Sequence, residues 1–393
     1  MEPSLLALFL VAGLASLFMA WVIGAGSSGA TPFAPAVGAN AISTMRAAFV
    51  VGLFGLAGAV TQGGNVSEAV GRGLVGGVSL PATGVIVALG IGATLMAVGI
   101  YTGYPIATAF TVTGAVIGVG LALGGTPVWA KYQQIGTVWV LTPFVGGGIA
   151  YGIASVLPRE DVPEWASVPV LAGVVGLVLA NVRFASLGPG GAPGSLARFG
   201  ARSVGFGGWV APLALSLGLA VVVAAVVHAD VRHDESGALT RVLLTLGSLV
   251  AFSAGGSQVG LAVGPLLPLL DDAGMLSPVV VLAGGGVGIL VGSWTGAPRM
   301  IKSLAQDYSS LGPRRSIAAL VPSFLIAQVA VLFGVPVSFN EIVVSAIIGS
   351  GAAVGGGGAV SARKIFVTVG AWAGSFVLAF AAGYGSMTAL AMA

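Results

Sequence analysis

Cysteine is absent from this chain of 393 residues, and charged side chains are scarce. Without cysteine the protein has no disulfide, no thiolate nucleophile and no cysteine-based metal site. Charged residues make up 7% of the sequence, whereas a soluble domain carries about 25%. Such a chain cannot supply the charged surface that water requires, so the sequence predicts a protein whose solvent is lipid.

Histidine is almost absent too. The two histidines, His228 and His233, are predicted to lie in a polar loop with Asp230, Asp234 and Glu235. This grouping leaves a metal site open, although a solvated loop is the simpler interpretation. No nucleophile–base pair or metal cluster is evident, so an enzyme is disfavoured and we expect no catalytic residue, cofactor or metal. The 15 basic residues are spread over connecting loops, which argues against binding of nucleic acid.

Long apolar segments are what the sequence has in abundance: 56% of residues are hydrophobic and the mean hydropathy is +1.05. A helix that crosses a hydrocarbon core about 30 Å thick needs about 20 apolar residues. We therefore predict an all-α, multi-pass protein of the plasma membrane with about 12 transmembrane spans, some of them short or broken by Gly or Pro. The spans lie near 4–24, 42–62, 82–101, 106–124, 135–157, 166–187, 208–228, 242–263, 273–297, 317–334, 340–360 and 365–385.

Basic residues between the spans predict the orientation. If the amino terminus is outside, ten of the 15 basic residues fall in inside loops. The five that fall outside are Arg72, Lys131, Arg183, Arg198 and Arg202. By the positive-inside rule, both termini are therefore predicted to lie outside.

The two ends of the sequence repeat one another at an offset of about 230 residues. The matched positions keep the same order: Ser27 with Ser257, Pro35 with Pro265, Gly103-Tyr-Pro with Gly334-Val-Pro, and Trp139 with Trp372. Seven spans precede the second copy, and an odd number inverts its orientation. We predict two inverted-topology repeats, 1–160 and 236–393, separated by two extra helices and polar linkers in 161–235.

Gly and Pro interrupt the predicted helices at four places: 24–35, 253–265, and after Pro105 and Pro336. Backbone groups freed at such breaks must be buried in protein or line a wet cavity. A half-helix N-terminus offers N–H groups and a positive dipole end, which suit an oxyanion. Neutral donors complete the predicted substrate site, although each is alternatively a helix-packing residue. They are Ser27, Ser28, Thr31, Thr108, Ser257, Gln258, Ser338 and Asn340.

Glu341 stands out among the ionisable residues because it follows the break at Pro336 and precedes the apolar run 342–348. A carboxyl at membrane depth is costly and is a functional candidate by default. Removal from water favours its neutral form, so Glu341 is a candidate proton carrier for coupling. The alternative is a helix-start carboxylate at the interface, where the helix dipole favours it.

The arrangement resembles the inorganic phosphate transporter family, often called PiT, over nearly the whole chain. The repeats of that family open with a Gly-Ala-Asn-Asp-Val-Ala-Asn type motif, followed by a Gly-Leu-Pro-Val-Ser-Thr-Thr-His type motif. Here 255–265 and 334–341 are similar to these motifs, and 25–31 and 103–110 hold their places in the first repeat. The resemblance implies a secondary transporter of an inorganic oxyanion, phosphate or, as in related members, sulfate.

The chain departs from the family where the motifs carry Asn–Asp pairs, because Ser27-Ser28 and Ser257-Gln258 stand there. In the family those residues are implied to bind phosphate and the coupling cation, and Na⁺ prefers charged oxygen ligands. We therefore expect H⁺ rather than Na⁺ to accompany the anion. A sulfate-type permease, a passive channel and a transport-inactive scaffold or regulator stay open as alternatives. A homo-oligomer is also compatible with the sequence.

Overall fold

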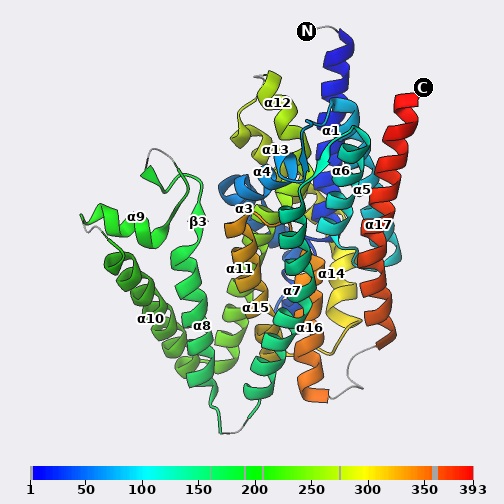
Figure 1. Ribbon diagram of the computed structural model, residues 1–393. Coiled ribbons are helices and arrows are strands. Elements are labelled where there is room, and N and C mark those ends of the chain that lie inside the picture. Colours follow the sequence, from blue (N-terminus) through cyan, green and yellow to red (C-terminus); the bar gives the residue numbers. More distant parts are fainter. Residues whose placement is uncertain are drawn as a thin grey trace.

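The protein is a bundle of helices that lie roughly along one direction (Figure 1). The computed structural model describes residues 3–159, 161–189, 192–205, 208–273, 276–355 and 362–392. The start of α1 and the end of α17 lie at the same, upper end of the bundle (Figure 1). The two ends of the described chain therefore lie at one end of the bundle, and the location of both termini outside the membrane stays a prediction.

The first part of the chain, up to residue 156, forms seven helices and one small sheet. The two-residue strands β1 (Val75–Gly76) and β2 (Thr126–Pro127) pair antiparallel, with Val75 opposite Pro127. The helices are α1 (Pro3–Gly26), α2 (Ala34–Gly38), α3 (Thr44–Gln62), α4 (Gly64–Arg72), α5 (Ala82–Thr102), α6 (Thr108–Ala122) and α7 (Trp129–Val156).

A hairpin of helices follows, and it stands at one edge of the bundle (Figure 1). It consists of α8 (Glu164–Asn181) and α10 (Val210–His233), which pack against each other. Their connection contains the antiparallel strands β3 (Arg183–Phe184) and β4 (Gly194–Ser195) and the short helix α9 (Leu196–Ser203).

The last part of the chain repeats the order of long and short helices seen in the first part, with one 3₁₀ turn added. Its elements are α11 (Glu235–Val263), η2 (Gly264–Leu266), α12 (Leu267–Ala273), α13 (Pro278–Thr295), α14 (Ala297–Gln306), α15 (Pro313–Phe333), α16 (Phe339–Gly355) and α17 (Ala362–Met392).

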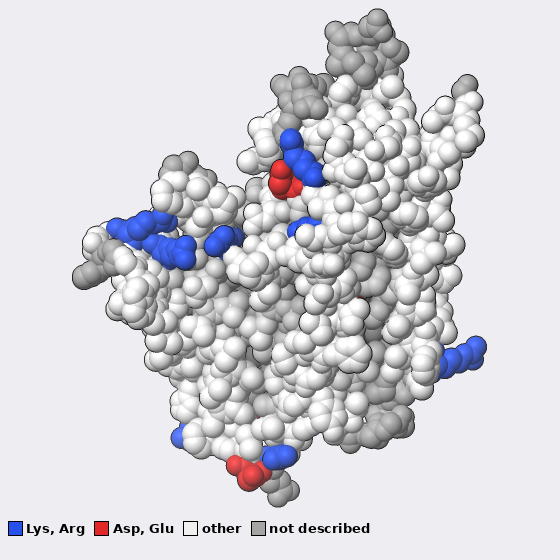
Figure 2. Space-filling view, in the orientation of Figure 1, with Lys and Arg blue, Asp and Glu red and all other residues white. Residues whose placement is uncertain are grey.

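Apolar helices account for the predicted spans. Within the described residues, ten helices are long and apolar enough to cross a membrane, and α6 and α16 are shorter apolar helices. These twelve helices coincide with the twelve apolar segments of the sequence. The prediction of an all-α, multi-pass membrane protein is confirmed. In the space-filling view most of the visible surface is uncharged, and the charged side chains form a few small groups (Figure 2).

The helix break predicted within 253–265 lies at the end of that range, because α11 continues through Val263 and the chain leaves the α-helix at Gly264. The reason is that Gly255 serves close packing: a Cβ atom there would lie 1.9 Å from the carbonyl oxygen of Gly55 in α3. The histidines are not in a loop, because His228 and His233 lie in the last turns of α10.

Glycine also brings α1 and α13 into contact. A Cβ atom on Gly292 would lie 2.0 Å from the carbonyl oxygen of Trp21, and one on Gly24 would lie 2.1 Å from that of Ile289. Small residues at such crossings let helix backbones approach closely, and van der Waals packing then holds the helices together in lipid.

We expect Gly292→Ala to destabilise the protein, because the added methyl group has to push α13 away from the α1 backbone. Overpacking of this kind costs about 1–3 kcal/mol. The unfolding temperature in detergent, followed by size-exclusion chromatography after heating, should fall. Gly90→Ala in α5 is the matched control, since a Cβ atom there has nothing within 4 Å. Equal unfolding temperatures for both variants would refute the packing role.

Candidate functional site

Helices α6 and α16 begin inside the protein, at the fully buried residues Thr108 and Phe339. Helix α6 has 15 residues, a length of about 22 Å at 1.5 Å per residue, shorter than the hydrocarbon core of about 30 Å. Each half-helix follows a sharp turn that ends the preceding helix, at Gly103 with φ +76° and at Gly334 with φ +59°. Glycine adopts this left-handed conformation without strain, so α5 and α15 end there and the chain re-enters the bundle.

Two tryptophans hold the unwound segments that lead into the half-helices. Trp139 in α7 donates its indole N–H to the carbonyl oxygen of Pro336 at 2.8 Å, and Trp372 in α17 donates to that of Pro105, also at 2.8 Å. Carbonyl groups outside a helix need such a partner in an apolar interior. The bonds are reciprocal, since each half of the chain holds the break of the other. The sequence matched these tryptophans as repeated positions but did not identify them as donors.

Gln258 and Asn340 tie the breaks together in the centre. The Oε1 atom of Gln258 accepts a hydrogen bond from Ser27 Oγ at 3.2 Å, and its Nε2 donates to the carbonyl oxygen of Val337 at 2.6 Å. The Nδ2 atom of Asn340 donates to the carbonyl oxygens of Gly26 at 3.1 Å and Ile106 at 2.7 Å. The end of α1, the C-terminal part of α11 and the starts of α6 and α16 therefore meet at one polar cluster.

The predicted site residues are all buried, and two of them are satisfied within their own segment. None is more than 1% exposed, and the set is Ser27, Ser28, Thr31, Thr108, Ser257, Gln258, Ser338, Asn340 and Glu341. Ser28 Oγ donates to the carbonyl oxygen of Ile23 at 3.4 Å, and Thr31 Oγ1 donates to that of Ser27 at 3.1 Å. Hydrogen bonds bring Ser27, Gln258 and Asn340 together, whereas Ser28 and Thr31 have no bond to that cluster among the contacts of the described residues.

Five of these residues carry a buried polar atom without a hydrogen-bond partner among the described residues. They are Thr108 Oγ1, Ser257 Oγ, Ser338 Oγ, Asn340 Oδ1 and Glu341 Oε2. An unpaired buried polar atom costs about 1–3 kcal/mol, and native proteins rarely tolerate several. These atoms lie at the starts of α6 and α16 and on α11 beside Gln258. Their unused hydrogen-bonding capacity indicates a site that binds a polar ligand or water.

The half-helix N-termini add a favourable field. The first-turn N–H groups of α6 and α16 have no acceptor within their own helix. The aligned peptide dipoles place partial positive charge at these ends. Backbone N–H groups, hydroxyls and the side-chain amide of Gln258 can thus surround an oxyanion without a basic side chain.

Glu341 lies in the first turn of α16 and is 1% exposed. This burial rules out an exposed position at the interface. In the described part of the chain no ion pair involves it, so a charge on this carboxyl would have no counter-ion. Likewise, no group of three His, Asp or Glu residues within the described ranges is placed to hold a metal ion.

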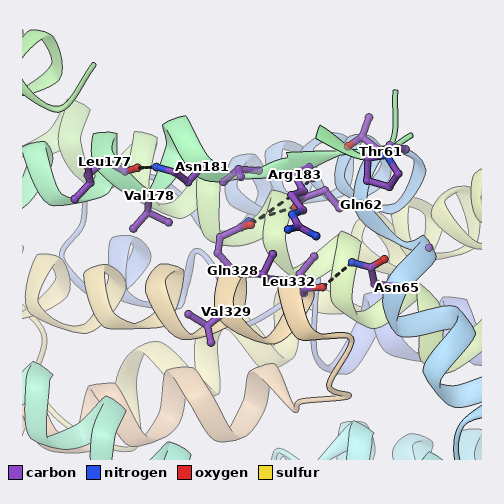
Figure 3. A pocket seen from close by; sticks show the side chains of 15 residues that line it. Thr61, Gln62, Asn65, Leu177, Val178, Asn181, Arg183, Gln328, Val329 and Leu332 are labelled. Carbon is purple, nitrogen blue, oxygen red and sulfur yellow. Dashed lines mark hydrogen bonds between the residues drawn. The ribbon is translucent and has the colours of Figure 1, made fainter. Parts of the chain in front are cut away.

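A second buried amide pair was missed by sequence reasoning. Gln62 in α3 and Gln328 in α15 donate to each other at 3.3 Å, and Gln328 also donates to Ser253 Oγ at 2.6 Å. Gln62 further donates to the carbonyl oxygen of Arg183 at 2.9 Å. The pair borders a cavity of about 250 Å³ between α3, α8 and α15 (Figure 3). An amide at the end of an apolar span was the available signal, because such side chains need a partner in lipid.

A helical membrane bundle in which two short helices start at a buried polar cluster has the design of a secondary transporter. The chain matches the Phosphate transporter family over residues 23–383, and it belongs to that family. The resemblance drawn from the sequence motifs is confirmed.

Relatives and a solved structure agree with this membership. A Pyrococcus abyssi protein named "Putative phosphate permease" is 28% identical over 385 residues, which cover 90% of each chain. The chloroplastic inorganic phosphate transporter 2-1 of Arabidopsis thaliana is 24% identical over 394 residues, 86% of this chain and 65% of that protein. A solved structure of "The sodium-dependent phosphate transporter" is similar with a TM-score of 0.81 and 23% identity, covering 98% of this chain and 99% of that one. At that identity the similarity bears on the fold.

Proposed function

We propose that this protein is a secondary transporter of inorganic phosphate in the plasma membrane, with H⁺ as the coupling ion. The observation that carries the proposal is the meeting of two half-helix N-termini at buried polar atoms that lack partners. Phosphate offers several acceptor oxygens, which match the first-turn N–H groups of α6 and α16 and the hydroxyls of Thr108, Ser257 and Ser338. Membership in the phosphate transporter family supports the same substrate.

The two halves, 1–160 and 236–393, are proposed to be inverted-topology repeats. Helix α7 ends at the lower end of the bundle, where the chain passes to α8, whereas its counterpart α17 ends at the upper end (Figure 1). The reciprocal Trp139–Pro336 and Trp372–Pro105 bonds support this relation. Rocking of one repeat against the other would then expose a central site to each side in turn.

The coupling ion follows from the charges at the site. Ser28 and Gln258, at the positions of the family's Asp residues, are neutral, so they supply no fixed charge to balance Na⁺. An anion that moves against a negative-inside potential costs about 2.3 kcal/mol per charge per 100 mV, and a cation must accompany it if it is to accumulate. Glu341 is the carboxyl at the site, and we assign it the proton.

Uptake of labelled phosphate and labelled sulfate into proteoliposomes tests this function. We expect saturable phosphate uptake that exceeds sulfate uptake and rises when the outside is more acidic than the inside. Faster sulfate uptake would make the protein a sulfate-type permease. No uptake of either anion by folded protein would favour a transport-inactive scaffold, and equilibration without accumulation would indicate a channel.

A further inference from the structure

The charged side chains in most of the hairpin of α8, α9 and α10 are all basic. Residues 165–229 contain Arg183, Arg198 and Arg202 but no Asp or Glu. In the described part of the chain no ion pair involves any of the three. Basic side chains gather over α9 at the left of the molecule, and no acidic side chain lies beside them (Figure 2). These arginines are also three of the five basic residues that depart from the predicted positive-inside distribution.

Helices α8, α9 and α10 line an open cavity of about 610 Å³ in this hairpin. Its volume is within the range of about 300–1,000 Å³ that is usual for ligand sites. Arg198 and Arg202 supply charged side chains to its lining, and Trp209, Leu177 and Leu213 contribute apolar wall. The lining of the cavity thus combines guanidinium groups with apolar side chains.

Arg198 and Arg202 offer more N–H donors than their hydrogen bonds among the described residues use. Each guanidinium carries five N–H donors in a planar fork that matches a phosphate group. Arg202 uses Nη2 to donate to the carbonyl oxygen of Leu187, a bond that orients the group. In the lining of the same cavity Asn181 Nδ2 donates to Ser216 Oγ at 2.9 Å.

The cavity lies at the end of the membrane-spanning part of the hairpin. Helix α8 ends at Asn181 and α10 begins at Val210, both beside the cavity. Phe199 on α9 is 48% exposed and Trp209 is 75% exposed. Exposed aromatic side chains beside basic ones are typical of elements that lie at the headgroup level.

We propose that this cavity binds the headgroup of an anionic phospholipid from the leaflet at the upper end. Arg198 and Arg202 bind the phosphate, and the acyl chains follow Leu177 and Leu213 toward the exposed apolar face of α10. The apolar wall favours a phospholipid over free phosphate, which has no hydrocarbon to place there. The absence of acidic residues over 165–229 favours a headgroup with net negative charge over a zwitterionic one. Lipid binding would also account for the basic residues on the side predicted to be outside.

Native mass spectrometry of the purified full chain, titrated with phosphatidylglycerol, tests the proposal. An Arg near an anionic membrane surface contributes about 1 kcal/mol, or about a fivefold change in affinity. We expect the double variant Arg198→Gln, Arg202→Gln to bind phosphatidylglycerol about thirtyfold more weakly than the wild type. Leu213→Trp, which fills the cavity and keeps both arginines, should also weaken binding, so the test does not depend on one variant.

Arg183→Gln is the matched control, because this arginine belongs to the same hairpin but does not line the cavity. Its affinity for phosphatidylglycerol should stay within about twofold of the wild type. An equal loss in Arg183→Gln would mean diffuse attraction without a site, and unchanged binding by the double variant would exclude these arginines. Equal affinity for phosphatidylcholine, or displacement of the lipid by inorganic phosphate at similar concentration, would overturn the assignment to an anionic phospholipid.

Discussion

Replacing Gln258 by leucine is expected to lower phosphate uptake at least about tenfold. The variant leaves the Ser27 hydroxyl and the Val337 carbonyl without the partners that Gln258 provides. A buried polar group without a partner costs about 1–3 kcal/mol, and 1.4 kcal/mol corresponds to a factor of ten. Initial rates of labelled phosphate uptake into proteoliposomes, normalised to folded protein, measure the effect.

Gln134→Leu provides the matched control for this experiment. Gln134 is exposed on α7, where its side chain accepts a hydrogen bond from Lys131 at 3.0 Å, and among the described residues its side chain has no hydrogen bond to Ser27, Gln258 or Asn340. Its uptake rate should equal that of the wild type. A folded Gln258→Leu protein that transports at the wild-type rate would show that the cluster is structural and does not belong to the transport path.

The second large effect is expected for Glu341→Gln, which should abolish the stimulation of uptake by an inward proton gradient. Glutamine has the shape of the neutral acid but cannot release a proton, so it separates binding from coupling. The carboxyl is 1% exposed, and burial favours its neutral form, which glutamine resembles. The substitution should therefore leave the unfolding temperature close to that of the wild type. Uptake is measured with an acidic exterior and again at symmetric pH.

Glu68→Gln is the control for removal of a carboxylate, since Glu68 is 64% exposed and pairs with Arg72 on α4. It should retain full stimulation by the pH gradient. Two results would contradict the proton assignment. One is uptake by the wild type that a Na⁺ gradient drives at symmetric pH, and the other is undiminished pH-driven uptake by Glu341→Gln.

Close contacts between residues distant in sequence explain why the break within 253–265 comes only at Gly264. The break expected over 253–265 rested on Gly255 and its glycine neighbours, which weaken a helix in isolation. In the folded protein Gly255 faces the α3 backbone at Gly55, and this packing keeps α11 helical through Val263. Composition alone does not distinguish a glycine that breaks a helix from one that admits a neighbouring helix.

The sequence also could not predict the hydrogen-bond partners of the buried polar side chains. Gln62 and Gln328 are 266 residues apart, as the bond between them records, and no local pattern pairs them. The same holds for Trp139 with Pro336 and for Asn340 with Gly26. Each side chain was visible as a polar group in an apolar span, but its acceptor depends on which helices become neighbours.

The sequence by itself determined the lipid environment, the positions of the twelve apolar helices and the breaks at 27–33, 103–107 and 334–338. Those features are local, because span length follows from consecutive apolar residues, and helix ends follow from Gly and Pro. Tertiary structure decided that the starts of α6 and α16 meet at Gln258 and Asn340. It also placed Arg198 and Arg202 at one cavity beneath α9. Such juxtapositions depend on the packing of whole helices, which in lipid is driven by shape and by pairing of buried polar groups.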